Sequence, residues 1–447
     1  MENSFLSLVA KDLYHKKGHH LHRVTMVFPN KRARLFFNKA LYQVAGKPMW
    51  TPQYVGINEL FALCKARNAE GKIWSIGDAI YLNGLLFQEY RKIFKDSSES
   101  FDDFYGWGKI LLQDFDNIDK NLADAQQVFR LISETEAFKD DFSHLSAEQV
   151  EMLQSFFKQF KSNSDDNSPI KNNFVHLWNK MFQLYNAFKQ RLSKEAVVYE
   201  GMYLREIAEN WESYSAQAFP AENYVFVGFN ALNKCEEKLF LHFKENGKAM
   251  FYWDYDHYYC DDDDNMPEAF VHEAGRFMRR NLKLFPNELP NHPYDDFLRR
   301  EKNIRLIASS SENAQAHYAA SRWLKQYSGS QSAIVLCNES LLLPMLHSLP
   351  QDIGTFNITM GYPLTQTPVF SLIQQIVLLH CDAATSSSSH AKFRSKYSLP
   401  LLQNSYIRRI SEQAKALADE LSEQHLFACP APFFHKDDVL TRLFCPV

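Results

Sequence analysis

A long run of helical periodicity lies between short segments with the pattern of buried strands, and this order restricts the possible fold more than any other feature. From residue 76 to residue 211, apolar residues recur at helical spacing almost throughout. Short apolar runs at 24–28, 224–227 and 249–253 predict strands on either side of it. The simplest arrangement is one α/β domain, residues 1–70 and 216–295, interrupted by an all-helical insertion, residues 71–215.

Helices are expected beside these strands. Phe5, Leu8, Val9 and Leu13 recur at helical spacing before the first strand. After it, Leu35, Phe36, Leu41 and Val44 predict an amphipathic helix. A further helix is expected at 234–243, between the later two strands.

A second alternation begins after residue 295. Strands are expected at 304–308, 333–337 and 356–359, and helices at 312–327, 341–347 and 369–379. This β-α-β-α-β-α order predicts a parallel sheet with helices on its faces. Residues 296–447 therefore form a second, incomplete α/β domain in this interpretation, and the tail from Phe393 is helical or irregular.

Composition limits the class of protein. The chain has 447 residues, of which 23% are charged and 45% hydrophobic, so it is neither disordered nor a disulfide scaffold. No apolar run approaches the roughly 20 residues that a membrane-spanning helix needs, so we expect no membrane partner. The seven cysteines form no C-x-x-C pair, which is typical of reduced thiols and favours a cytoplasmic location.

The residues that bind and hydrolyse ATP in a P-loop protein are missing. The motif needs Gly five residues before a Gly-Lys pair and Ser or Thr after it. The pairs that begin at Gly46, Gly71, Gly108 and Gly247 meet neither requirement. Gly228 and Phe229 follow the strand at 224–227, where an acidic pair would hold Mg²⁺. We therefore predict no ATPase activity, no catalytic residue and no cofactor.

Basic residues gather at the start of the chain, although the net charge is −4. Residues 1–40 hold eight Lys or Arg against two acids. Lys31, Arg32 and Arg34 follow the first strand and are candidates for contacts with DNA phosphates, or alternatively belong to a solvated helix face. Further DNA-binding candidates are Arg276, Arg279 and Arg280 at helical spacing, with an exposed helix as the alternative. Thr359, after the last expected strand, is another, with a role in turn geometry as its alternative.

Four stretches, in this order, resemble AddB-type nuclease subunits. They are Val27-Phe28-Pro29-Asn30-Lys31-Arg32-Ala33, Tyr224-Val225-Phe226-Val227-Gly228-Phe229-Asn230-Ala231-Leu232 followed by Glu236 and Glu237, Trp253-Asp254-Tyr255-Asp256-His257-Tyr258-Tyr259, and Asn357-Ile358-Thr359-Met360-Gly361-Tyr362-Pro363-Leu364. The resemblance implies parallel sheets like those of P-loop NTPases and superfamily 1 helicases, with a large helical insertion and lost ATP motifs.

The resemblance also implies a function. Such subunits act in double-strand break repair and recombination, bind DNA and work with an AddA-like superfamily 1 helicase/nuclease subunit. They carry a PD-(D/E)XK nuclease domain at the C-terminus. No D…(D/E)-x-K trio between strands follows residue 359 here, so the expectation is a helicase-like DNA-binding scaffold without the nuclease domain.

Two alternatives belong to other classes. One is an assembly module that binds only protein, and the net acidity favours it. The other is an unrecognised enzyme or metal-binding protein that uses Asp254 and His257. Cys260, residues 261–264, His272 and Glu273 could join a metal site. Zinc sites usually have tighter ligand spacing, so turn capping and a solvated acidic loop are favoured over metal binding.

Overall fold

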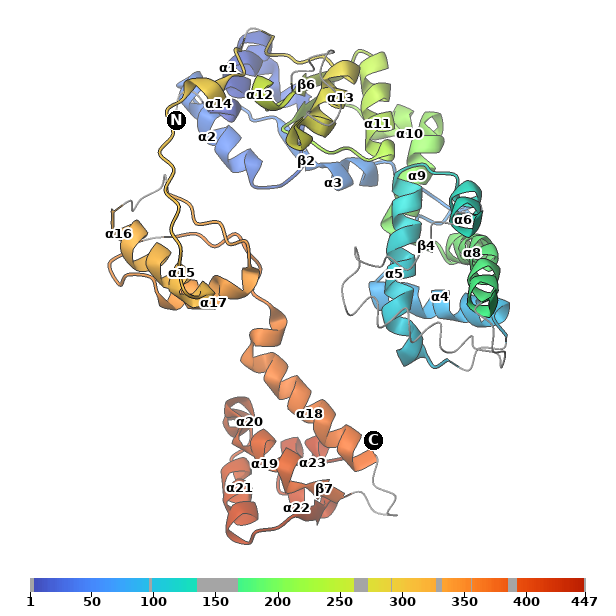
Figure 1. Cartoon of the computed structure of the whole chain (residues 1–447), viewed down its shortest axis with the longest axis vertical. Helices are drawn as coiled ribbons and strands as arrows, with labels where there is room; N and C mark the ends of the chain where they lie inside the picture. Colours follow the sequence, from blue (N-terminus) through green and yellow to red (C-terminus); the bar gives the residue numbers. More distant parts are fainter. Residues whose placement is uncertain are drawn as a thin grey trace. The chain divides into compact units, whose positions relative to one another are not determined.

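The computed structural model divides the chain into two compact units, Met1–Lys302 and Asn303–Val447 (Figure 1). It describes residues 4–95, 99–134, 168–260, 272–290, 292–326, 332–354, 356–384 and 392–445. The domain boundary expected at residue 296 lies a few residues before the division between these units.

A four-stranded parallel sheet forms the centre of the first unit. Its order is β2-β1-β5-β6, from β1 (Val24–Phe28), β2 (Gln53–Gly56), β5 (Asn223–Val227) and β6 (Ala249–Tyr252). The register pairs Met26 with Tyr54 on one side and with Val225 on the other. The three strands expected from apolar runs are confirmed, because a strand covered on both faces has a continuous apolar sequence.

Alternate side chains of each strand enter two different cores. Met26, Val225 and Tyr252 pack under α1 (Phe5–Lys17) and α2 (Ala33–Ala45) on one face. Val27, Phe226 and Phe251 point to the other face and join a larger core that includes α11 (Lys234–Glu245). The unit is therefore helix-covered on both faces of the sheet, as a doubly wound parallel sheet requires.

A helical layer lies between β2 and β5 in the sequence (Figure 1). Its helices are α3 (Ile57–Ala62), α4 (Ala79–Ile93), α5 (Phe101–Lys120), α6 (Ala125–Glu134), α8 (Ser168–Glu195), α9 (Glu200–Glu209) and α10 (Trp211–Ala218). The only strands described in this layer are β3 (Ser75–Ile76) and β4 (Val197–Val198), a short parallel pair. The unit ends with α12 (His257–Cys260), α13 (Arg276–Leu284) and α14 (Asp296–Arg299).

A fully buried carboxylate connects three elements of this layer. Asp119 of α5 accepts hydrogen bonds from the hydroxyls of Tyr185 and Tyr199, each at 2.5 Å. Lys189 Nζ lies 3.0 Å from Asp119 Oδ1, and Arg205 Nη1 lies 3.2 Å from the same oxygen. Burial and the nearby carboxylate raise the pKa of both tyrosines, so both hydroxyls remain donors. The network fixes α5 against α8 and α9.

The approach of α9 to α5 requires a glycine. Gly201 N donates to Asp116 Oδ1 at 2.6 Å, and a Cβ atom at this position would lie 2.3 Å from the Asp116 carbonyl oxygen. Gly201→Ala is expected to lower the free energy of unfolding by about 1–3 kcal/mol, because α9 must shift. Urea unfolding followed by circular dichroism measures this change.

Gly84 of α4 is the matched control for Gly201, because a Cβ atom there would meet no other atom within 4 Å. Gly84→Ala is expected to stabilise the protein by about 0.5–1 kcal/mol through helix propensity. If the Gly201→Ala protein were as stable as the Gly84→Ala protein, the conclusion that α9 lies too close to α5 for a side chain at residue 201 would be wrong.

The second unit differs from the sequence prediction. The expected helices appear as α15 (Glu312–Tyr318) continued by Ala319–Trp323 and α16 (Leu324–Gln326), as α17 (Leu342–His347) and as α18 (Pro368–Ala384). The strands expected at 304–308, 333–337 and 356–359 do not form, and the described part of this unit contains no parallel sheet. Leu306 is 95% exposed and Val335 85% exposed, so these apolar segments lack the neighbours that a parallel strand needs.

The C-terminal part of this unit has its own helical core. It contains α19 (Ser395–Gln403), α20 (Ser405–Ile410), α21 (Gln413–Glu423), α22 (Ala431–Phe434) and α23 (Asp438–Leu443), with an antiparallel pair of β7 (Lys392–Arg394) and β8 (Ala428–Pro430). Leu401, Leu417 and Phe434 are buried in this core with Leu379 of α18. Across both units, no described helix is long and apolar enough to cross a membrane.

Candidate nucleic-acid interface

The carboxyl ends of the four parallel strands meet at one edge of the sheet in the first unit. The chain leaves β1 through α2 to reach β2 on one side, and it leaves β5 through α11 to reach β6 on the other. The strand order therefore reverses between β1 and β5. In open α/β sheets, ligands bind outside the strands' carboxyl ends at this reversal.

The predicted basic residues lie directly at this reversal. Lys31, Arg32 and Arg34 follow β1 and are exposed. Lys31 Nζ lies 2.7 Å from Glu59 Oε1, and this ion pair lowers the pKa of Glu59, with a smaller contribution from the charge of Arg34. No ion pair holds Arg32 among the residues that the structure describes. Arg32 therefore presents the least neutralised charge of the three.

The backbone after β1 is not arranged as a phosphate cradle. Asn30 Oδ1 accepts hydrogen bonds from the backbone N–H groups of Arg32, at 3.2 Å, and of Ala33, at 3.1 Å. In a P-loop, backbone N–H groups at this place bind phosphate. Here a side chain of the same loop already occupies two of them.

The strand beside it also ends without the groups that ATP chemistry uses. Gly228 follows β5 with a left-handed φ of 71°, and its N–H donates to the Tyr252 carbonyl. A Cβ atom on Gly228 would lie 3.8 Å from Cε1 of Phe5, so an aromatic ring covers this end of β5. No carboxylate follows the strand here, in agreement with the sequence.

None of the four Gly-Lys pairs lies in a loop that joins a strand to a helix at this edge. Gly46 ends α2 with φ of 61°, and Gly247 lies in the turn between α11 and β6 with φ of 66°. Gly71 lies in a turn that the Arg67–Ile73 bridge closes. Gly108 is inside α5, where a Cβ atom would lie 2.1 Å from Asn83 Oδ1.

The predicted arginines of α13 lie beside the loop after β5. Asn281 of this helix donates to the Asn230 carbonyl at 2.6 Å, which places α13 against that loop. Arg279 donates to the carbonyls of Tyr259 and His272, and Arg280 forms an ion pair with Glu237. Arg276 is exposed. Two of the three arginines therefore also hold local structure.

The segment after β6 serves mainly to shape the turn. Asp256 accepts hydrogen bonds from the backbone N–H groups of Tyr258, at 2.9 Å, and Phe297, at 2.7 Å. The Tyr258 ring stacks on Phe297 with centroids 4.4 Å apart. Partial burial of the Asp254 carboxyl group raises its pKa, although the residue as a whole remains exposed.

The other candidates concern the second unit and the alternative metal site. Thr359 belongs to the second unit, where it is exposed in an extended segment outside any strand. The described residues contain no group of three His, Cys, Asp or Glu side chains placed to hold a metal ion. Residues 261–264, part of the alternative metal site, lie outside the described residues.

The helix expected after the first strand is confirmed as α2, but only Leu41 and Val44 of its predicted apolar set pack into the core. Leu35 is 63% exposed and Phe36 is 59% exposed, whereas Phe37 is fully buried and Leu41 nearly so. Three consecutive apolar residues, 35–37, allow either rotation of the helix, so periodicity alone could not decide. The basic segment and an exposed apolar face therefore share one helix, which the sequence interpretation missed.

No protein-family model matches the chain. No curated protein matches it with significant similarity.

Proposed function

We propose that this protein is a helicase-like DNA-binding scaffold that does not hydrolyse ATP, comparable to the N-terminal half of AddB-type nuclease subunits in double-strand break repair. The proposal rests on three exposed cations at the reversal of a parallel sheet: Lys31 and Arg32 in the loop after β1, and Arg34 in the first turn of α2. Ligands of open parallel sheets bind at this place, and cations there attract the negatively charged phosphates of DNA.

The mechanism is electrostatic positioning. Arg32 and Arg34 contact phosphate oxygens, and Lys31 contributes less because Glu59 partly neutralises it. The exposed Arg276 of α13, beside the loop after β5, extends the positive surface. Such contacts fix the position of the nucleic acid and carry no sequence information directly.

Loss of ATP chemistry has a local physical basis in this proposal. Asn30 occupies the backbone donors that would bind phosphate, and Gly228 stands where a magnesium-binding acid would follow β5. Translocation would then come from a partner, which by resemblance is an AddA-like superfamily 1 helicase/nuclease subunit.

The test is the affinity of the full chain for a fluorescein-labelled forked duplex, measured by anisotropy at about 50 mM and about 200 mM salt. If three duplex phosphates are contacted, the fourfold rise in salt should weaken binding about 40-fold. The affinity should be the same with and without ATP. Absence of binding at the lower salt would refute the proposal and favour a protein-assembly module.

A further inference from the structure

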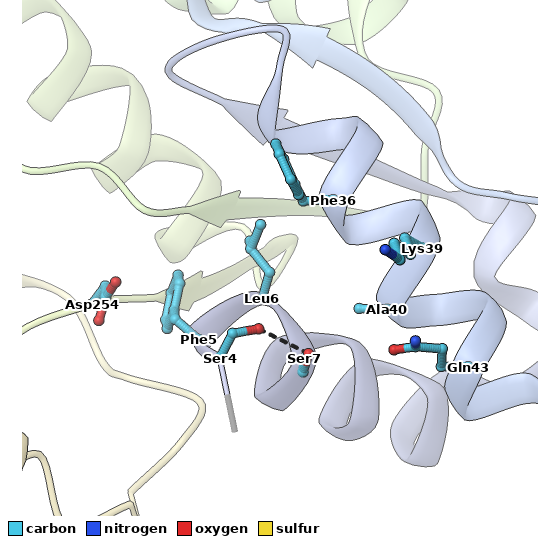
Figure 2. Close-up of a pocket in the computed structure, with 9 residues that line it drawn as sticks. All are labelled: Ser4, Phe5, Leu6, Ser7, Phe36, Lys39, Ala40, Gln43 and Asp254. Atoms are coloured by element: carbon cyan, nitrogen blue, oxygen red, sulfur yellow. Dashed lines mark hydrogen bonds between the residues drawn. The ribbon is translucent and has the colours of Figure 1, made fainter. Parts of the chain in front are cut away.

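A pocket opens between α1 and α2 at the carboxyl edge of the sheet (Figure 2). Its volume is about 350 Å³. Phe5 and Leu6 come from the start of α1, Phe36 and Lys39 come from α2, and Asp254 follows β6. In Figure 2, the Phe5 and Leu6 side chains lie between Asp254 and α2. Ala40, Ser4, Ser7 and Gln43 complete the lining, which therefore combines apolar side chains with uncharged polar ones, one cation and one acid.

The outer face of α2 extends this apolar lining. Leu35 and Phe36 are more than half exposed, and Tyr42 is 69% exposed two turns later. Residues 35, 39 and 42 follow helical spacing, so Lys39 lies on the same face as these apolar side chains. An exposed apolar patch beside a pocket, with a basic rim, is typical of a protein-binding surface.

The charge around the pocket favours an acidic partner. Between Asp12 and Glu59 the sequence contains no acid. Of the eight cations there, Lys16, Arg23 and Lys31 form ion pairs with Asp12, Glu222 and Glu59, and the others are Lys17, Arg32, Arg34, Lys39 and Lys47. Within the described part of the chain, no ion pair engages Lys39 or Arg32. Carboxylates of a partner would therefore meet the unneutralised Lys39 in the lining of the pocket.

The position of Asp254 favours a peptide over a nucleic acid. A phosphate placed in the pocket would meet this carboxylate, whereas an apolar side chain would not be repelled. Leu6 and Leu35 also present aliphatic groups, on which bases do not stack as they do on aromatic rings. The best fit is an aromatic side chain inside the pocket with acids outside it, near Lys39.

We propose that the pocket between α1 and α2 binds an acidic peptide segment of a partner protein, with one aromatic side chain of that segment inserted against Phe5 and Phe36. This site is separate from the phosphate contacts of the loop after β1 and does not depend on DNA binding by the chain. Central aromatic anchors with a charged rim account for most of the binding energy in such interfaces.

The test uses the full chain and a fluorescein-labelled peptide, Asp-Asp-Asp-Asp-Gly-Phe, with fluorescence anisotropy as the readout. We expect saturable binding below about 1 mM. Replacing the terminal Phe of the peptide by Ala should weaken binding by at least about tenfold. No binding up to that concentration, or equal affinity for the two peptides, would overturn the proposal.

Matched variants locate the site. Phe36→Ala and Lys39→Glu should each weaken peptide binding by at least about tenfold. Phe427→Ala, at another exposed phenylalanine, and Lys238→Glu, at an exposed lysine of α11, should leave it unchanged. If the control variants weaken binding as much as the pocket variants, the peptide binds elsewhere and the proposal is wrong.

A parallel titration with the forked duplex separates this site from DNA binding. The proposal predicts that Phe36→Ala leaves DNA affinity unchanged while peptide binding is lost. If peptide binding occurs and DNA binding does not, the DNA-scaffold function fails and the pocket assignment stands. If Phe36→Ala and Lys39→Glu lower only DNA affinity, this face is a nucleic-acid surface and the peptide proposal is overturned.

Discussion

Replacing Asp119 by alanine is expected to lower the free energy of unfolding of the first unit by about 3 kcal/mol. The substitution leaves Lys189 and Arg205 without their shared carboxylate and removes the acceptor of two tyrosine hydroxyls. The expected loss is at the low end for buried ion pairs, because the Lys189 and Arg205 side chains are 24% and 20% exposed. Urea unfolding followed by tryptophan fluorescence measures the loss.

Two further variants isolate the charge of Asp119. Asp119→Asn keeps an oxygen acceptor for Tyr185 and Tyr199 but loses the charge, so its effect should lie between those of the wild type and Asp119→Ala. Asp102→Asn changes an exposed acid in the first turn of the same helix and should cost less than about 1 kcal/mol. If the Asp119→Ala protein were as stable as the Asp102→Asn protein, the conclusion that the Asp119 network stabilises the first unit would be wrong.

The combined substitution Lys31→Ala, Arg32→Ala and Arg34→Ala is expected to weaken binding to a forked duplex by about 10–100-fold at about 50 mM salt. It should also reduce the slope of log affinity against log salt by about 2–3, because up to three phosphate contacts are lost. Single substitutions of Arg32 or Arg34 should weaken DNA binding more than substitution of Lys31, because Glu59 partly neutralises Lys31. Anisotropy titrations at several salt concentrations give both quantities.

A double variant controls for the loss of positive charge. Arg299 and Arg300 form ion pairs with Asp295 and Asp296, 2.5 Å and 2.8 Å away. Arg299→Ala with Arg300→Ala removes two cations that already have anionic partners, so DNA affinity should fall less than about threefold. Equal losses in the two variants would mean that net charge, rather than the loop after β1, determines binding.

The strands of the first unit could be predicted closely from the sequence. The prediction at 24–28 matches β1, and the later two predictions differ from β5 and β6 by one residue at one end. Fully buried parallel strands need apolar side chains on both faces, so their sequence signal is continuous and local. The candidate loop at 31–34 could be placed for the same reason, because it follows directly from the end of such a strand.

Features that depend on distant contacts could not be predicted. The partners of Asp119 lie 66 to 86 residues away in the sequence, and nothing in their spacing relates them. The Phe5 ring lies close to Gly228, although the two residues are far apart in the sequence. The segments at 304–308 and 333–337 have apolar sequences typical of strands, but strand formation requires a neighbouring backbone, which local pattern does not encode.

The location of bound DNA on the chain is the most direct test of the proposed scaffold. Hydrogen–deuterium exchange of the full chain, with and without a saturating forked duplex and without ATP, measures it. The account predicts slower exchange of backbone amides at residues 29–39, after β1, and at 228–233, after β5, when DNA is bound. Unchanged exchange at residues 29–39 under saturation, with protection elsewhere, would show that DNA does not bind at the reversal of the sheet.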